Sequence, residues 1–177
     1  LWIRPRPGTD AAIALGILHV IINENLFDEN FVSNWCHGFE ELEKRVEDYP
    51  VDKVSKISWV PEEQIVAAAR LFAAANPGTV EWGLALEHTP NCIQTCRAVA
   101  LIPAVTGNID VPGGWIKGRD FMPPAFSNIE RLTSEQQKKR LGCEKYKLLG
   151  GPEAFNTSAP IPTLFDASMT GKPYPDR

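Results

Sequence analysis

The longest apolar run in the chain, residues 11 to 22, predicts a helix that is buried on most of its sides. Its apolar side chains recur with helical spacing on two adjacent faces. They are Ile13, Ile17, Val20 and Ile21 on one face and Ala14, Leu18 and Ile22 on the next. We therefore expect a helix from about Asp10 to Asn25 at the centre of its domain, with His19 as a hydrogen-bonded structural histidine.

Amphipathic spacing and helix-start signals predict four further helices in the first half of the chain. They cover residues 28 to 35, with Asp28 as N-cap; residues 39 to 46, ended by Pro50; residues 51 to 57; and residues 61 to 75, with Pro61 at the first helical position. Prolines suit that position because its amide has no partner within the helix.

Residues 79 to 86 are the best strand candidate, and a helix from Thr89 to about Thr106 should follow them. Thr89 is the expected N-cap of that helix and Pro90 its first residue, while Gly107 and Asn108 should end it. A helix–strand–helix order is typical of an α/β layer. One strand makes no sheet, so the partner strands would lie outside this chain.

From Ile109 onward the periodic pattern is lost, and turn residues replace it. Proline-rich stretches at residues 122–124 and 159–162 continue this irregular character, and residues 133–141 form the one short exposed helix expected there. We therefore divide the chain into a compact part, residues 1–114, and an irregular, Pro/Gly-rich connecting segment, residues 115–177. The predicted fold class is α/β, with mostly helical content.

Composition narrows the classes of function. The 177 residues are 44% hydrophobic and 23% charged, which is typical of a globular protein, and the net charge of −4 argues against a general nucleic-acid binder. No apolar run is long enough to span a bilayer. Cys92 and Cys96 share a helix face, but no further pair of metal ligands accompanies them, so the four cysteines are expected to be small buried thiols and no metal site is predicted.

The segment from Arg4 to Asp10 is the first candidate site. Its prolines favour extended backbone, and Gly8 permits either a close approach or a positive φ. Thr9 and Asp10 are both good N-cap residues, so free amides, a hydroxyl and a carboxylate should meet at this corner. Amides suit an anion, and a carboxylate suits a donor edge such as that of guanine. An ordinary helix cap explains the same residues.

The turn after the expected strand is the second candidate, because ligands of open α/β sheets bind beyond the carboxyl ends of strands. Glu87 and His88 can hydrogen-bond a polar ligand there. Two solvated polar residues in a loop are the alternative interpretation.

Four blocks in order resemble the molybdopterin oxidoreductases of the dimethyl sulfoxide reductase type. Residues 6–12 are similar to that family's RPGTDxA segment, and residues 82–87 to its WGxGxEQH segment. Arg97-Ala98 with residues 106–114 resembles its RA…TGNIxxPGG block, and residues 170–175 its TGKPYP stretch. Single blocks are weakly specific, but four in the family's order over essentially the whole chain are specific.

The resemblance implies part of a Rossmann-like domain that binds molybdopterin guanine dinucleotide with molybdenum or tungsten. It places Gly8, Thr9 and Asp10 at the guanosine end of one dinucleotide. It places the segment Trp82-Gly83-Leu84 and His88 near the second dinucleotide or its pterin. The chain departs from the family pattern at Ala85, His88 and Thr89, where glycine, glutamine and histidine are usual. No catalytic residue is assigned within it.

The resemblance also implies that this chain is an internal piece of a prokaryotic, cytoplasmic or periplasmic enzyme. A 4Fe-4S segment and the metal ligand would lie upstream, and a further cofactor domain downstream. The parent enzyme would act on a small substrate by two-electron transfer, with an iron–sulfur electron-transfer subunit as a partner and no membrane insertion of its own. Two alternatives stay open, which are a stand-alone nucleotide-binding or helical interaction module and a non-redox relative such as a hydratase.

Overall fold

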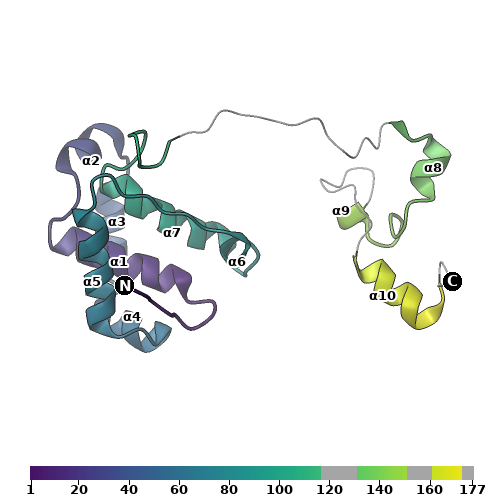
Figure 1. The fold of residues 1–177 in the computed structure, drawn as a ribbon, viewed down its shortest axis with the longest axis horizontal. Helices are drawn as coiled ribbons and strands as arrows, with labels where there is room; N and C mark the ends of the chain where they lie inside the picture. The colour runs from purple at the N-terminus through teal and green to yellow at the C-terminus, as the bar shows by residue number, and fades with distance from the viewer. Residues whose placement is uncertain (117–130, 151–160, 173–177) are drawn as a thin grey trace. The chain divides into compact units, whose positions relative to one another are not determined.

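The computed structural model describes residues 1–116, 131–150 and 161–172, and the regular structure in these ranges is helical (Figure 1). The chain divides into two compact units, Leu1–Gly118 and Arg119–Arg177. The first contains α1 (Asp10–Asn23), α2 (Glu29–Trp35), α3 (Phe39–Val46), α4 (Val51–Ser58), α5 (Glu62–Ala74), α6 (Leu84–Glu87) and α7 (Cys92–Val105). The second contains α8 (Ser134–Lys138), α9 (Lys147–Gly150) and α10 (Ile161–Thr170). Within the described ranges, no helix has the length and apolar character that crossing a membrane requires.

Helix α1 lies at the centre of the first unit, as its apolar pattern predicts. It packs against α7, α5, α4 and α3 (Figure 1), and Leu18 and Ile21 are completely buried. At Gly16 the contact with α4 is so close that an added Cβ would lie 3.0 Å from the side chain of Val54. His19 is the expected structural histidine, because its Nδ1 lies 3.0 Å from the carbonyl oxygen of Val46.

The predicted starts of the short helices are largely confirmed. The side chain of Asp28 caps α2 by accepting a 2.8 Å hydrogen bond from the amide of Phe31. Pro61 stands at the N-cap of α5, one position before the expected one. Pro50 does not end α3, which stops at Val46, but it is the N-cap residue of α4.

The predicted strand at residues 79–86 is wrong. Residues 79–83 have no regular secondary structure, and Leu84–Glu87 turns into α6. A strand needs a neighbour to pair with, and within the described residues the pairing is limited to an isolated bridge between Ile109 and Trp115. The α/β expectation is therefore met only in its mostly helical part, and a Rossmann-like sheet is not confirmed by these residues.

Side chains from the turn after α7 hold residues 78–80 in place of a strand ladder. The buried side chain of Asn108 accepts a 2.7 Å hydrogen bond from the amide of Gly78 through its Oδ1. Its Nδ2 donates to the hydroxyl of Thr106 at 2.8 Å. The indole of Trp115 donates to the carbonyl oxygen of Val80 at 2.7 Å. These bonds fix the course of the chain just before the second candidate site.

Helix α7 begins later than predicted. Its first residue is Cys92 and its N-cap is Asn91, with a left-handed φ of 67°, so neither Thr89 nor Pro90 starts it. The hydroxyl of Thr89 instead donates to the carbonyl oxygen of Leu86 at 3.1 Å and closes the turn after α6. The end of the helix at Val105, before Gly107 and Asn108, agrees with the prediction.

In the second unit, the expected irregular tail is not confirmed over the described residues. The predicted exposed helix near residues 133–141 is present as α8, which begins with a capping box between Thr133 and Gln136. Ile161–Thr170 forms α10, with Pro162 in its first turn, where the helix tolerates a missing amide. The proline stretches at 122–124 and 159–160, and residues 173–175, lie outside the described residues.

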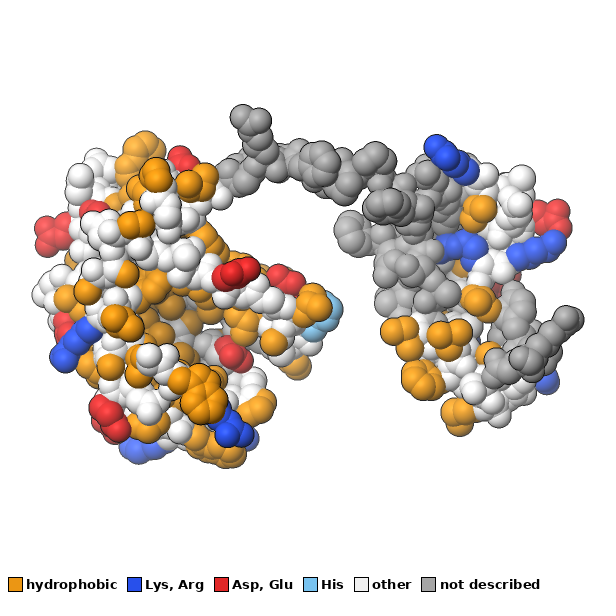
Figure 2. Space-filling model, viewed as in Figure 1, with side chains coloured by type: hydrophobic (Ala, Val, Ile, Leu, Met, Phe, Trp, Pro, Cys, Tyr) orange, Lys and Arg blue, Asp and Glu red, His pale blue; other side chains and the backbone are white. Residues whose placement is uncertain are grey.

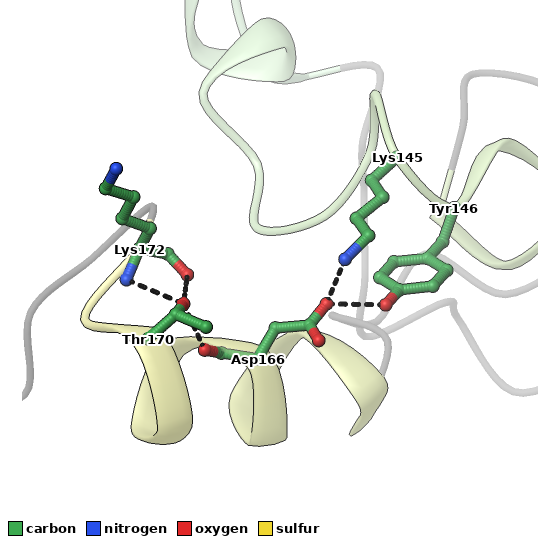
Figure 3. A network of polar contacts seen from close by, with 5 residues as sticks. All are labelled: Lys145, Tyr146, Asp166, Thr170 and Lys172. Carbon is green, nitrogen blue, oxygen red and sulfur yellow. Dashed lines mark hydrogen bonds and ion pairs between the residues drawn. The ribbon is translucent and has the colours of Figure 1, made fainter.

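A polar network ties α10 to the residues before α9 (Figure 3). The carboxylate of Asp166 accepts hydrogen bonds from Nζ of Lys145 and, at 2.7 Å, from the hydroxyl of Tyr146. The bond from Lys145, and then that from Tyr146, lowers the pKa of the Asp166 carboxyl below its usual range. The same bond to Asp166 raises the pKa of Lys145. Both groups are therefore charged and engaged with each other at neutral pH.

Removing the centre of the core should destabilise the first unit strongly. We expect Leu18→Ala to lower the free energy of unfolding by roughly 2–5 kcal/mol, because a fully buried side chain leaves a cavity. Urea denaturation followed by circular dichroism measures this. The matched control is Leu71→Ala, whose side chain is 63% exposed and should cost less than about 0.5 kcal/mol. Equal losses in the two variants would contradict the central position of α1.

Removing the side-chain tether should release residues 78–80. We expect Asn108→Ala to cost about 1–3 kcal/mol, because the buried amide of Gly78 loses its acceptor. Native-state hydrogen exchange should show faster exchange at the Gly78 amide. Asn34→Ala, which removes an exposed asparagine of α2, should leave that rate unchanged. An unchanged Gly78 rate in Asn108→Ala would refute the tether.

Candidate functional site

The corner at Gly8 is a tight turn that leads into α1. The amide of Thr9 donates to the carbonyl oxygen of Arg6 at 3.2 Å, and Gly8 between them has a φ of 81°. A proline followed by a glycine with positive φ is the pattern of a type II turn. An added Cβ at Gly8 would have no heavy atom within 4 Å. The backbone of this turn is thus open to a close approach.

Thr9 is the N-cap residue of α1, but it caps differently from the prediction. Its hydroxyl donates to the carbonyl oxygen of Arg6 at 2.6 Å and makes no side-chain cap bond. Its own carbonyl oxygen accepts the amides of Ala12 and Ile13. The amides of Asp10 and Ala11, at the first turn, have no acceptor within the helix. The corner therefore presents amide donors next to a carboxylate.

The basic residue before the turn anchors this corner on the end of α4. The amide of Arg6 donates to the carbonyl oxygen of Ser58 at 2.8 Å. Its guanidinium carbon lies 5.1 Å from the centre of the Trp59 ring, in cation–π geometry. Backbone and side chain thus both hold the entry to α1, which limits the freedom of the turn that follows.

Asp10 lies at the edge of a pocket of about 300 Å³ in the first unit. The described residues that line it are otherwise apolar. They are Pro5, Ile13, Ala14, Ile17, Ala68, Phe72, Val80, Leu86, Val99 and Ile102. Figure 2 shows a hollow with hydrophobic side chains around it on this unit. Among the described residues, none donates a hydrogen bond to the half-buried carboxylate of Asp10, and none forms an ion pair with it. This strong acceptor is therefore available to a ligand.

The fold brings the two candidate segments to the same pocket. The pocket is lined by Asp10 together with Leu86, which belongs to the second segment, and Val80, which lies just before that segment. Gly83 is exposed, and an added Cβ there would meet nothing within 4 Å. Leu84 is 65% exposed, and His88 is exposed as well. The two segments, some seventy residues apart in the sequence, thus form neighbouring walls.

Two side chains of the second segment are already engaged. The indole of Trp82 donates to the carboxylate of Glu87 at 3.0 Å, and its ring packs edge-on against Trp115 with centroids 5.1 Å apart. Glu87, which the sequence made a candidate ligand contact, therefore serves first to orient Trp82. His88 has no such side-chain bond among the described residues, and its backbone amide donates to Leu84 at 2.9 Å.

Sequence reasoning missed the residues that position this segment. Asn108 lies in the TGNI block and was expected only to end a helix, and Trp115 was not singled out. An aromatic residue directly after Gly113-Gly114 was the available signal, because large aromatic side chains in turns often pack on a neighbouring segment. The apolar lining residues Phe72 and Val80 gave no signal of their own, since buried apolar residues are common.

No group of three or more histidine, cysteine or acidic residues that could hold a metal is present in the described ranges. The four cysteines are free thiols and half-buried, which is more exposed than expected. The candidate site supplies a carboxylate acceptor, open backbone at two glycines and an apolar pocket.

Comparison with known proteins identifies relatives along the whole chain. No family model matches it. Acetylene hydratase of Syntrophotalea acetylenica is 37% identical over an alignment 198 residues long, and this alignment covers 99% of this chain and 27% of the relative. Dimethyl sulfoxide reductase DmsA of Haemophilus influenzae is 30% identical over 132 residues, covering 64% of this chain and 16% of the relative. The solved structure of acetylene hydratase from Pelobacter acetylenicus matches with a TM-score of 0.65 at 36% identity, over 99% of this chain and 27% of that one.

The chain thus spans about a quarter or less of the length of these relatives. Sequence identity and structural likeness agree over nearly all of its residues, and the corner at residues 6–12 and the segment at 82–88 carry the motifs that first indicated the relationship. The chain belongs to the molybdopterin enzymes of the dimethyl sulfoxide reductase type.

Proposed function

We propose that this chain is a cofactor-binding part of a molybdenum or tungsten enzyme that carries molybdopterin guanine dinucleotide. The observation that carries the proposal is the pocket shared by Asp10 and the segment at residues 80–86, with the Asp10 carboxylate unpaired among the described residues. The chain binds and orients the cofactor and is not catalytic alone. The whole enzyme acts on a small substrate by two-electron transfer.

Asp10 is the proposed anchor for the guanine base. Its two carboxylate oxygens can accept hydrogen bonds from the ring N–H and the amino group of guanine, and such charge-assisted pairs are roughly twice as strong as neutral ones. Gly8 leaves open space for the nucleotide to approach the turn. The hydroxyl of Thr9 donates its proton to Arg6, so toward the ligand it acts as an acceptor. These residues fit a guanine nucleotide.

The second segment is the proposed contact with the other dinucleotide or its pterin. Gly83 offers open backbone, Leu84 an exposed apolar side chain and His88 an imidazole that can donate or accept one hydrogen bond. The Trp82 side chain, held by Glu87 and Trp115, adds a ring face at a fixed position. The metal and the pterin supply the redox chemistry, and the protein supplies binding and orientation.

Other parts of the proposal concern the protein beyond this chain. We infer a Rossmann-like domain whose sheet strands come from outside these residues. We also infer an upstream 4Fe-4S segment with the metal ligand, an iron–sulfur electron-transfer partner and a prokaryotic enzyme of the cytoplasm or periplasm. The family resemblance supports each of these.

A hydratase is the second candidate, and one observation favours it. The acetylene hydratase relative aligns with 99% of this chain, whereas the dimethyl sulfoxide reductase relative aligns with 64%. Addition of water to a carbon–carbon triple bond transfers no net electrons, so the two candidates differ in their need for an electron acceptor or donor. The recognition residues described above would serve either enzyme.

Substitution of Asp10 tests the anchor. In the full-length protein that carries this chain, we expect Asp10→Asn to lower cofactor occupancy, because the amide loses one of the two acceptors and the charge that strengthens both bonds. Occupancy is measured as metal and released guanine nucleotide per polypeptide. The matched control, Asp52→Asn, breaks only an exposed pair with Lys56 and should keep full occupancy. Full occupancy of a folded Asp10→Asn protein would refute the guanine-anchor role.

Dependence on an electron acceptor separates the two candidate activities. The oxidoreductase proposal predicts that turnover of a small substrate by the full-length holoenzyme changes the redox state of an artificial dye in proportion to the product formed, with an oxidised dye reduced if the substrate is oxidised and a reduced dye oxidised if the substrate is reduced. Product formed from acetylene and water with no change in dye absorbance would instead support the hydratase. The measurement is product analysis with parallel recording of the dye at one wavelength.

A further inference from the structure

The second unit contains a pocket of about 460 Å³ that no part of the proposed cofactor site uses. Four cationic and two anionic side chains are among the described residues that line it. The cationic side chains are those of Lys138, Arg140, Lys145 and Lys172, and the anionic ones are those of Glu144 and Asp166. The pocket therefore has an excess of positive charge in a chain whose net charge is −4.

The two carboxylates do not neutralise all of the lysines. Asp166 is engaged by Lys145 and Tyr146 (Figure 3). The ammonium groups of Lys138 and Lys172 form no ion pair with any residue that the structure describes, and both side chains belong to exposed residues. Figure 3 shows the Lys172 side chain leading away from Asp166 while its backbone amide donates to the hydroxyl of Thr170, at 3.2 Å. Two exposed ammonium groups therefore lie at the pocket without an ion-pair partner among the described residues.

A buried hydroxyl adds a donor whose bonding potential is unused. Thr163, in the first full turn of α10, also lines the pocket and is only 3% exposed, and its Oγ1 has no hydrogen-bond partner in the part of the chain that the structure describes. Gly142, with a φ of 71°, leaves room for this hydroxyl, since an added Cβ would lie 2.1 Å from it. A buried polar atom without a partner is costly, so a ligand oxygen that accepts its proton would be stabilised.

We propose that this pocket binds a phosphate-class oxyanion through Lys138, Lys172 and the hydroxyl of Thr163. A tetrahedral oxyanion presents oxygens in several directions, so two ammonium groups and a hydroxyl that approach from different residues can each bond to a different oxygen. The volume exceeds that of a bare phosphate, so the oxyanion can be either free or carried by a small organic group.

Equilibrium dialysis of the 177-residue chain against radiolabelled inorganic phosphate, at constant ionic strength set with chloride, tests the site. We expect saturable binding at one site per chain. The Lys138→Gln/Lys172→Gln double variant should bind at least about tenfold more weakly, because it loses two charge-assisted bonds. Both lysines are exposed, so circular dichroism should show an unchanged helix content. Absence of saturable binding by the unmodified chain would overturn the proposal.

Two further variants separate a built site from general charge attraction. Lys139→Gln removes the same charge from the neighbouring position, which does not line the pocket, and should change the affinity less than twofold. A loss in Lys139→Gln equal to that of the double variant would overturn the proposal. Thr163→Val, which keeps the shape of the side chain, should weaken binding in a folded protein.

Tighter binding of glycerol 3-phosphate than of phosphate would support a phosphomonoester ligand, and equal affinity would support free phosphate.

Discussion

The burial of α1 on several sides is the constraint on which the first unit depends. A helix whose apolar residues extend around most of its surface cannot face water, so α3, α4, α5 and α7 must cover it. Leu18 and Ile21 are completely buried as a result. The same packing determines where the helix begins, because the chain before it is bonded to the end of α4 through Arg6. Asp10 is thereby held at the edge of the apolar pocket.

The second wall of the pocket depends on a different kind of bond. Residues 78–80 have no strand neighbour within the described chain, and their backbone groups are instead bonded to Asn108 and Trp115. The TGNI block and the residues after it thus have a structural task, which is to hold the segment that continues through Trp82 to His88. The site forms from two segments far apart in the sequence because each is fixed separately, one by helix packing and one by side-chain hydrogen bonds.

Local signals in the sequence predicted much of this fold. The apolar run of α1, the Asp28 cap and the end of α7 are determined by residues within one or two turns of each other, and the structure agrees with them. The prediction of a strand at residues 79–86 was wrong because strand pairing depends on residues that the segment itself does not contain. The Gly8 turn was within reach of sequence reasoning, but the use of the Thr9 hydroxyl, the tethering role of Asn108 and the polar pocket of the second unit depend on tertiary contacts.

We propose that Asp10 and the segment at residues 80–88 form neighbouring walls of one cofactor site. An experimental structure of the full-length holoenzyme tests it most directly. We expect a guanine base whose ring N–H and amino group lie within hydrogen-bond distance of the Asp10 carboxylate, with Gly83 in contact with the other dinucleotide or its pterin. A cofactor bound elsewhere, with the Asp10 carboxylate paired to a protein side chain instead, would contradict it.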